Sequence, residues 1–457
     1  MPSPSTEAGL AARQAAEARF TANNPLSQQQ HTVALGSLPG GNTRSILHTS
    51  PFPLTMKKGI DSYVWDVDGH RYLDLVGEFS AGLLGHSHPT IRRTIQNTLS
   101  PEQGEGPGIS LGATTPHEQT YAATLCTRFH LDRVRLTNSG TEANLHALAG
   151  ARHYMNTRHG SSGAGGPRWR KVVVFSGGYH GAVLAFGNGE PAANTVDRKD
   201  FVVVPRYNDL ALAREVIERT AGVAAVLVEA VQGAGGGIPG TREFLMGVRE
   251  AAREKGAVFI LDEVMTSRLA PGGLGTELGL DPDMVTLGKY LGGGLAIGAF
   301  GGKEEIMRVF DPRVEGGLAH SGTFNNNTLV VTVGRVVLEE VYTPEVCREF
   351  NERAERFRER LVAVAKGSRL SFTGRGSLIG LHFTEGGLEE VRCGEDVRAQ
   401  ERGDLKDLFW FEFIEAGFWT TRRGFLCLIL GTPEEELDRF VEAVRGILEK
   451  HKDLMML

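Results

Sequence analysis

Five short apolar runs, separated by stretches with helical periodicity, most constrain what this chain can fold into. Each run is rich in valine, isoleucine or leucine, as buried strands are. The runs are Lys171–Phe175, Phe201–Pro205, Ala224–Glu229, Val258–Leu261 and Met284–Leu287. Strands that alternate with helices usually pair in parallel, because each helical crossover returns the chain to the same end of the sheet. The pattern therefore predicts an α/β domain in which helices cover both faces of a mostly parallel sheet.

The chain on either side of this alternation follows other patterns. A helix is predicted over Ala8–Phe20, and the pair Asp68-Gly69 between two alternating runs predicts a β-hairpin. Beyond about residue 340, charged amphipathic stretches at Arg348–Val364 and Glu434–His451 flank a strand at Ser377–Phe383, as in an α+β domain. A glycine- and serine-rich stretch, Gly160–Pro167, has the composition of a flexible surface insertion.

Composition excludes several classes of protein. The net charge is −6 and 23% of the 457 residues are charged, so no basic field favours nucleic acid or an anionic membrane. Four separate cysteines without a C-x-x-C pair argue against disulfides and a zinc cluster, and no metal is expected. The first thirty residues lack the apolar core of a signal peptide, and no apolar run has membrane-spanning length. A cytoplasmic protein is expected; a weak mitochondrial presequence stays an open alternative.

One lysine and one aspartate at the ends of predicted strands suggest a cofactor site. Lys289 follows the apolar run that ends at Gly288 and precedes a glycine-rich stretch, where a primary amine could form an imine with an aldehyde. The alternative is a solvated turn lysine. Asp262 supports the catalytic interpretation, because it ends the neighbouring run and would bring a carboxylate to the same edge of the sheet.

Polar and small residues follow other strands in the same way. Leu136–Asn144 opens a helix with hydroxyls and a glycine, which suits a phosphate but equally an ordinary N-cap. Phe175–Ala182 sets Tyr179 and His180 between glycines, either to meet a ligand or in a plain turn. Val228–Gly237 places a glutamate and a glutamine at another strand end. The glycine-rich stretches complete neither the dinucleotide-binding motif nor the P-loop motif.

From about Pro39 to Phe425 the chain resembles the class III aminotransferases, which are pyridoxal 5'-phosphate enzymes of fold type I. The motifs that carry the resemblance occur in the family's order. They are Asn138-Ser-Gly-Thr-Glu-Ala143, Gly178-Tyr-His-Gly181, Val228-Glu229, Leu261-Asp-Glu-Val-Met-Thr266, Thr286-Leu-Gly-Lys289, Gly298-Ala-Phe-Gly-Gly302 and Ser321-Gly-Thr-Phe324.

The resemblance implies a mostly parallel seven-stranded sheet in a large domain, with a small α+β domain formed by both termini. The implied limits are 1–95 for the N-terminal segment and part of the small domain, 96–340 for the large domain that binds the cofactor, and 341–457 for the rest of the small domain. The implied activity is transamination between a small-molecule amino donor and a keto acid acceptor.

The resemblance also assigns the catalytic residues and the phosphate site. Lys289 would bond to the cofactor aldehyde and later move the substrate proton. Asp262 would pair with the ring nitrogen and favour its protonated form, so that the ring accepts electrons. Ser139, Gly140 and Thr141 would hold the phosphate.

Further contacts to the cofactor are implied on both sides of its ring. Tyr179 would stack on one face and Val264 on the other. Gln232 would touch the ring hydroxyl, with Glu229 in support. Thr323 would reach the phosphate of a neighbouring subunit, which implies a homodimer with shared sites.

Three segments depart from the family pattern. Ala230 replaces a proline, Ser267-Arg268 replaces a Gly-Phe-Arg type sequence, and Phe324–Asn327 is unusual where many relatives carry Ser/Gly-Asn-Pro. None of these bears on the bond to Lys289, but each could alter the mouth of the pocket.

Arginines in two loops suggest how carboxylates are bound, since the guanidinium fork matches a carboxylate. Arg44 and Arg423 are candidates for binding a carboxylate, although each could equally be an ordinary surface arginine. For Arg422 the surface role is favoured. These loops look most like those of aromatic β-amino acid aminotransferases, in which matching arginines bind the substrate carboxylate and 2-oxoglutarate. The expected reaction moves the amino group of a β-phenylalanine-like β-amino acid to 2-oxoglutarate. The alternatives are glutamate-1-semialdehyde 2,1-aminomutase and a non-catalytic protein that binds pyridoxal phosphate.

Overall fold

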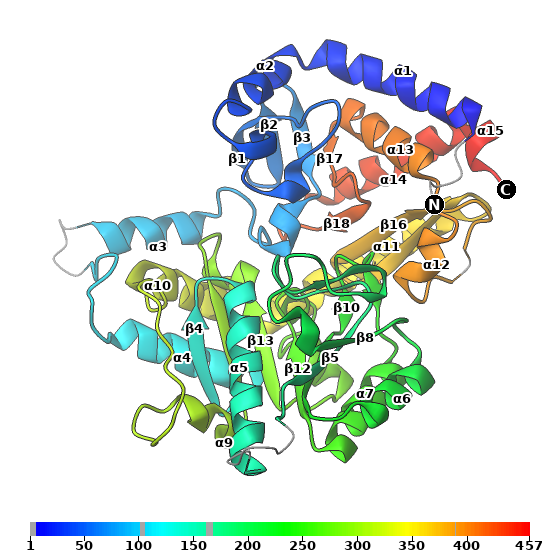
Figure 1. The fold of residues 1–457 in the computed structure, drawn as a ribbon. Helices are drawn as coiled ribbons and strands as arrows, with labels where there is room; N and C mark the ends of the chain where they lie inside the picture. The colour runs from blue at the N-terminus through cyan, green and yellow to red at the C-terminus, as the bar shows by residue number, and fades with distance from the viewer. Residues whose placement is uncertain (1–5, 101–105, 161–167, 389) are drawn as a thin grey trace. The chain divides into compact units, whose positions relative to one another are not determined.

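The computed structural model (Figure 1) describes residues 6–100, 106–160, 168–388 and 390–457. Contacts between residues divide the chain into two compact units. Unit 1 comprises Met1–His88, Arg353–Val391 and Asp396–Leu457, and unit 2 comprises Pro89–Glu352 and Arg392–Glu395. The domain limits implied at 95/96 and 340/341 stay a prediction. Of the expected insertion Gly160–Pro167, all but Gly160 lies outside the described residues.

A seven-stranded sheet forms the centre of unit 2. Its strand order is β4 (Arg133–Thr137), β14 (Gly298–Gly302), β13 (Met284–Gly288), β12 (Val258–Asp262), β9 (Val223–Glu229), β5 (Lys171–Phe175) and β8 (Phe201–Val204). Only β14 is antiparallel to its neighbours, and the pairs from β13 to β8 are parallel. The predicted mostly parallel sheet is confirmed, and all five apolar runs are strands in it.

Helices cover both faces of this sheet because successive strand residues point to opposite sides. Val172 and Val174 of β5 belong to a buried cluster with Ala147 of α5 (Gly140–Arg158). Phe175, one residue on, instead places its ring 5.4 Å from that of Phe244 in α7 (Arg242–Lys255). The other helices of this unit are α3 (Pro89–Leu99), α4 (Pro116–Phe129), α6 (Leu210–Arg219), α8 (Leu274–Leu278), α9 (Glu304–Met307) and α10 (Thr328–Val336).

Unit 1 joins segments from both ends of the chain. Its four-stranded sheet has the order β1 (Met56–Ile60), β2 (Tyr63–Asp66), β3 (Arg71–Asp74) and β17 (Phe418–Trp419), so a C-terminal strand completes an N-terminal sheet (Figure 1). The antiparallel β2–β3 pair contains the hairpin predicted at Asp68-Gly69, and Gly69 has the positive φ of 99° that such a turn favours.

The remaining strands of unit 1 form an antiparallel sheet of β15 (Leu370–Arg375), β16 (Leu378–Phe383) and β18 (Phe425–Cys427). Its helices are α1 (Glu7–Asn23), α2 (Pro25–Ala34), α13 (Gly403–Glu415), α14 (Glu434–Lys450) and α15 (Lys452–Met455), while α11 (Pro344–Ala365) and α12 (Gly394–Arg398) each span a boundary between the units. In the described residues, no helix is both long and apolar enough to cross a membrane.

Candidate active site

The carboxyl ends of neighbouring parallel strands in unit 2 bring several polar side chains to one edge of the sheet. Asp262 ends β12 and Glu229 ends β9, and the two residues are paired in register. Lys289 lies three residues beyond Thr286 of β13, the register partner of Asp262. In open α/β sheets, ligands bind at this edge.

Asp262 is held in one orientation by three hydrogen bonds. His180 Nδ1 lies 2.8 Å from Oδ2, Asn144 Nδ2 donates to the same oxygen at 2.8 Å, and the Val264 backbone N–H donates to Oδ1 at 2.9 Å. Thr286 Oγ1 donates to Asn144 Oδ1 at 2.8 Å, which fixes the direction of the amide. All of these side chains except that of Val264 are buried, so the carboxylate is shielded from water.

Asn144, His180 and Thr286 were not among the predicted site residues. Asn144 lies four residues after Gly140 and four before the buried Leu148 in α5, and a polar residue at this spacing, on the face that holds buried apolar residues, is the sequence signal that could have found it. His180 was expected either to meet a ligand or to lie in a plain turn, and its Nδ1 faces Asp262 instead. Both residues orient the carboxylate.

Lys289 has a backbone conformation that is uncommon for lysine. Its φ is +59°, in the left-handed region, where a residue other than glycine costs on the order of 1 kcal/mol. The preceding strand β13 is buried throughout, and a short 3₁₀-helix, Lys289–Gly292, begins at the lysine. Strain of this kind is concentrated at functional sites, so it agrees with the catalytic interpretation of Lys289.

The start of α5 provides a cradle for an anion. Ser139 is its N-cap and accepts a hydrogen bond from Glu142 N at 3.2 Å, so the ordinary capping interpretation is also correct. A Cβ at Gly140 would lie 2.8 Å from both methyl groups of Val264, and one at Gly181 would lie 2.3 Å from Thr141 Oγ1. Glycine is therefore required for this close packing. The first N–H groups of a helix have no intrahelical acceptor, and they suit a phosphate.

Gln232 and Tyr179 show that the residues present fit pyridoxal phosphate. Gln232 Nε2 donates to Ser176 O at 2.9 Å, whereas its Oε1 is buried without a hydrogen-bond partner among the described residues. An unpaired buried acceptor costs roughly 1–3 kcal/mol, and the hydroxyl of the cofactor ring is a suitable donor. Tyr179 is 46% exposed between buried neighbours, so its ring is available for stacking.

Glu229 connects two glycine-rich loops of the site. Its Oε1 accepts from Tyr179 N at 2.8 Å and its Oε2 from Gly233 N at 3.2 Å. Burial raises the pKa of Glu229 to about 7, and the charge of Asp262 adds to this, while His180 and the two N–H donors act against it. Glu229 thus holds the backbone of Gly233, the residue that follows Gln232.

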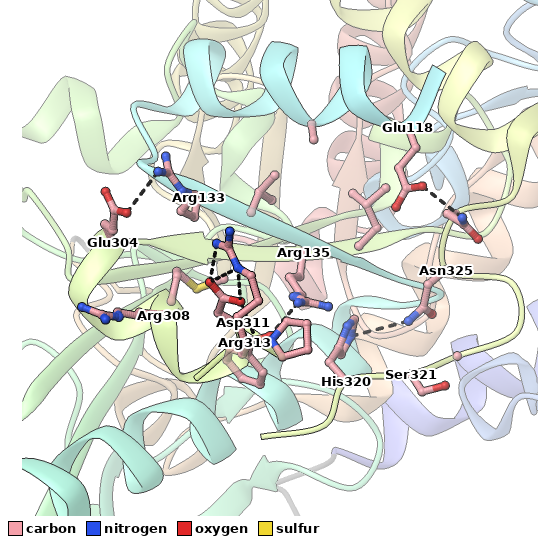
Figure 2. Close-up of a pocket in the computed structure, with 18 residues that line it drawn as sticks. Glu118, Arg133, Arg135, Glu304, Arg308, Asp311, Arg313, His320, Ser321 and Asn325 are labelled. Atoms are coloured by element: carbon pink, nitrogen blue, oxygen red, sulfur yellow. Dashed lines mark hydrogen bonds and ion pairs between the residues drawn. The ribbon is translucent and has the colours of Figure 1, made fainter. Parts of the chain in front are cut away.

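The structure places Thr323 on the surface of unit 2, in the loop that precedes α10. That loop lines a cavity of about 690 Å³ with residues of α4, β4 and α9, and Figure 2 shows Ser321 and Asn325 at one side of it. The reach of Thr323 to a neighbouring subunit stays a prediction.

Arg44 and Arg423, from opposite ends of the chain, meet at one aromatic ring of unit 1. Their guanidinium carbons lie 5.0 Å and 5.2 Å from the centroid of Phe79. Arg44 also forms an ion pair with Glu78. Glu78 and Phe79 lie in a run from Gly77 to Ser80 in which every φ is positive, between 46° and 77°. Neither Glu78 nor Phe79 was predicted as a site residue, because no residue pattern in Gly77-Glu-Phe-Ser80 indicates a left-handed turn.

Arg422 has a different environment from its neighbour. Its Nε and Nη2 donate to the two oxygens of Asp407 at 2.7 Å and 2.8 Å, and Nη1 donates to the Ser50 carbonyl. A bidentate pair of this kind fixes the loop. The arginine for which a ligand role was disfavoured is therefore engaged within the protein.

Comparison with known proteins decides the family. The sequence model of the class III aminotransferase family matches residues 47–404, which is most of the chain. The chain belongs to the class III aminotransferases. Pyridoxal 5'-phosphate is the cofactor of this family, so the expected cofactor and the enzyme assignment are confirmed.

Several members of the family are similar over nearly their whole length. A β-phenylalanine transaminase of Variovorax paradoxus is 44% identical, covering 96% of each chain. The crystal structure of the β-phenylalanine aminotransferase from that organism has a TM-score of 0.90, with 97% of this chain and 98% of that chain covered. An uncharacterised aminotransferase of Schizosaccharomyces pombe is 42% identical over 98% of this chain and 97% of its own length. These matches confirm the fold type I architecture.

Proposed function

We propose that this aminotransferase moves the amino group of a β-amino acid, similar to β-phenylalanine, to 2-oxoglutarate, giving a β-keto acid and glutamate. The observation that carries the proposal is the convergence of Arg44 and Arg423 on Phe79. Two cations beside one apolar ring suit donors that combine a carboxylate with an aromatic group, and also suit an acceptor with two carboxylates. The 44% identity to a β-phenylalanine transaminase supports the same substrate class.

Within this proposal the two arginines have separate tasks. Arg44 binds the carboxylate of the β-amino acid, and Arg423 binds 2-oxoglutarate in the return half-reaction. Glu78 is the counter-ion of Arg44 when no substrate is bound, because the ion pair occupies the guanidinium that a substrate carboxylate needs. Both partners are substantially exposed, so exchange of one carboxylate for another costs little.

The residues proposed to bind the cofactor belong to unit 2. When bound, pyridoxal phosphate supplies an aldehyde that takes up the amino group and a ring that accepts electrons. The amine of Lys289 holds the cofactor and later moves the proton at the substrate carbon that carries nitrogen. Asp262 keeps a proton on the ring nitrogen, because a buried carboxylate stabilises a cation beside it.

The other cofactor residues position the ring and the phosphate. Ser139, Gly140 and Thr141 hold the phosphate at the start of α5, and Tyr179 and Val264 cover the two faces of the ring. Gln232 accepts a hydrogen bond from the ring hydroxyl, with Glu229 holding the adjoining loops. We propose in addition that the protein is a cytoplasmic homodimer in which Thr323 completes the phosphate site of the partner. Light scattering would test the dimer, and Thr323→Ala should weaken cofactor binding in it.

The test of the reaction is an absorbance scan of the purified protein before and after adding β-phenylalanine without a keto acid. We expect the visible band of the lysine-bound cofactor to bleach, and 2-oxoglutarate to restore it with release of glutamate. No change with β-phenylalanine would contradict the donor class. Turnover of glutamate-1-semialdehyde without any added keto acid would indicate the aminomutase instead.

A further inference from the structure

Three consecutive asparagines, at the point where the chain departs from the family pattern, attach one loop to three different segments of unit 2. We call residues 320–327 the asparagine loop. Asn327 Oδ1 caps α10 by accepting from Val330 N at 3.1 Å, and its Nδ2 donates to Ser110 Oγ at 3.2 Å. Asn326 Nδ2 donates to Ala113 O at 3.1 Å and Glu118 Oε2 at 3.0 Å. Asn325 Oδ1 accepts from Asn138 Nδ2 at 3.0 Å.

Asn325 also determines the shape of its own loop. Its backbone N–H donates to Gly322 O at 3.1 Å, and its Nδ2 lies 3.5 Å from His320 Nε2 (Figure 2). A Cβ at Gly322 would lie only 2.4 Å from Asn325 Oδ1, so the side chain packs directly against that glycine. Thr323 lies between these contacts. The amide of Asn325 therefore fixes the segment that presents Thr323.

The partner of Asn325 belongs to the phosphate cradle. Asn138 directly precedes the N-cap Ser139, and both its backbone N–H and its Nδ2 donate to Glu142 Oε2, at 3.0 Å and 3.2 Å. One amide thus links the acidic residue of the first turn of α5 to the asparagine loop. A shift of Asn325 would be transmitted to the turn that carries Ser139, Gly140 and Thr141.

We propose that Asn325 is a positioning residue for the cofactor phosphate: through Asn138 it holds the cradle at the start of α5 and the loop of Thr323 in one arrangement. The inference rests on the proposed function, because it takes residues 139–141 as the phosphate site. Supporting contacts of this kind matter because the residues that touch a ligand keep their orientation only if neighbouring residues hold them in place. Asn326 has no such contact with the cradle among the described residues, although it is the adjacent residue of the same loop.

The experiment measures the affinity of the apo-protein for pyridoxal phosphate and for pyridoxal, which lacks the phosphate. Asn325→Leu should weaken binding of pyridoxal phosphate about tenfold, the effect of one supporting hydrogen bond, and leave pyridoxal binding unchanged. Asn326→Leu is the matched control: it removes contacts of the same loop with Ala113 and Glu118 that do not involve Asn138, so it should weaken pyridoxal phosphate binding clearly less than Asn325→Leu does. A general loss of structure would weaken both ligands, and thermal unfolding of each apo-variant identifies a variant that does not fold.

A double-mutant cycle makes the test specific to the Asn138–Asn325 contact. Asn138→Ala combined with Asn325→Leu should weaken pyridoxal phosphate binding no more than the stronger single variant does. Independent, multiplying effects would overturn the proposal, as would unchanged affinity in Asn325→Leu. Ser139→Ala distinguishes an error in the proposed phosphate site from an error in the proposed role of Asn325. If Ser139→Ala binds normally, the phosphate site is wrong; if it binds weakly and Asn325→Leu does not, only the role of Asn325 is wrong.

Discussion

The polar groups of unit 2 and the arginines of unit 1 are held in opposite ways. Asp262 is buried and receives three hydrogen bonds from residues that are themselves held by the sheet and α5. Arg44 is 44% exposed and contacts Glu78, which is 58% exposed, and the ring of Phe79. From this difference we expect the cofactor to be bound by a preorganised site and the substrate carboxylates to be bound by side chains that exchange partners.

The largest effect should come from the lysine of unit 2. Lys289→Ala removes the amine that we propose bonds to the cofactor and moves the proton, so we expect transaminase activity to fall at least about a thousandfold. Steady-state rates and the visible spectrum measure this. Lys303→Ala is the control, because Lys303 is paired with Asp283. Residual activity close to that of the unsubstituted protein would rule out the proposed role of Lys289.

The arginines of unit 1 should divide the two half-reactions between them. Arg44→Gln should lower kcat/KM for β-phenylalanine about a hundredfold, because a bidentate charged contact is lost, and Arg423→Gln should do the same for 2-oxoglutarate. Single-turnover kinetics of each half-reaction separate these effects. Arg422→Gln should lower stability instead, since Arg422 pairs with Asp407. Equal effects of Arg44→Gln and Arg423→Gln on both halves would argue against separate tasks.

The buried amide of Asn144 tests preorganisation directly. Asn144→Ala removes one donor to Asp262 and leaves Thr286 Oγ1 without its acceptor, so we expect kcat to fall about ten- to a hundredfold, as when other supporting contacts are lost. Asn156→Ala on the same helix is the control, because the described hydrogen bonds of Asn156 join it to the Arg152 carbonyl and to the backbone carbonyl and N–H of Trp169. An unchanged kcat in Asn144→Ala would mean that the site is less dependent on its buried network than we infer.

Burial of Glu229 should also make the stability of unit 2 depend on pH. Its pKa rises from 4.5 to about 7, so between these values the unfolded chain releases a proton that the folded protein keeps. The free energy of unfolding should therefore fall as pH rises through this window, by on the order of 1 kcal/mol per pH unit. Urea unfolding of the apo-protein at several pH values measures the slope. Glu229→Gln should flatten it, as should Glu263→Gln, whose carboxyl pKa burial also raises to about 7; an unchanged slope in both would contradict this.

The same contrast explains what could be predicted from the sequence. The positions of strand ends can be predicted because apolar runs stop at Asp262, Glu229 and Lys289. A parallel sheet then brings such strand ends to the same edge. Accordingly Glu229 and Asp262 are register partners at one edge of the sheet, and Gly140 lies against Val264, two residues beyond Asp262. Glu78 and Phe79 were missed because their position depends on a left-handed turn and on contacts with residues far away in the chain. A left-handed turn of this kind has no periodic pattern of apolar residues from which it could be predicted.

Glu78 should give the smallest effect and the sharpest test of partner exchange. Glu78→Gln removes the charge that competes for Arg44, so β-amino acid donors should bind more tightly; since the ion pair is exposed, we expect only about a twofold to fivefold lower KM with kcat nearly unchanged. The gain should shrink at high salt, because screening already weakens the pair. The 2-oxoglutarate half-reaction is the internal control, as Arg423 is its proposed partner. A higher KM for β-phenylalanine in Glu78→Gln would show instead that Glu78 orients Arg44 for the substrate, and the arginine site would then be preorganised like that of Asp262.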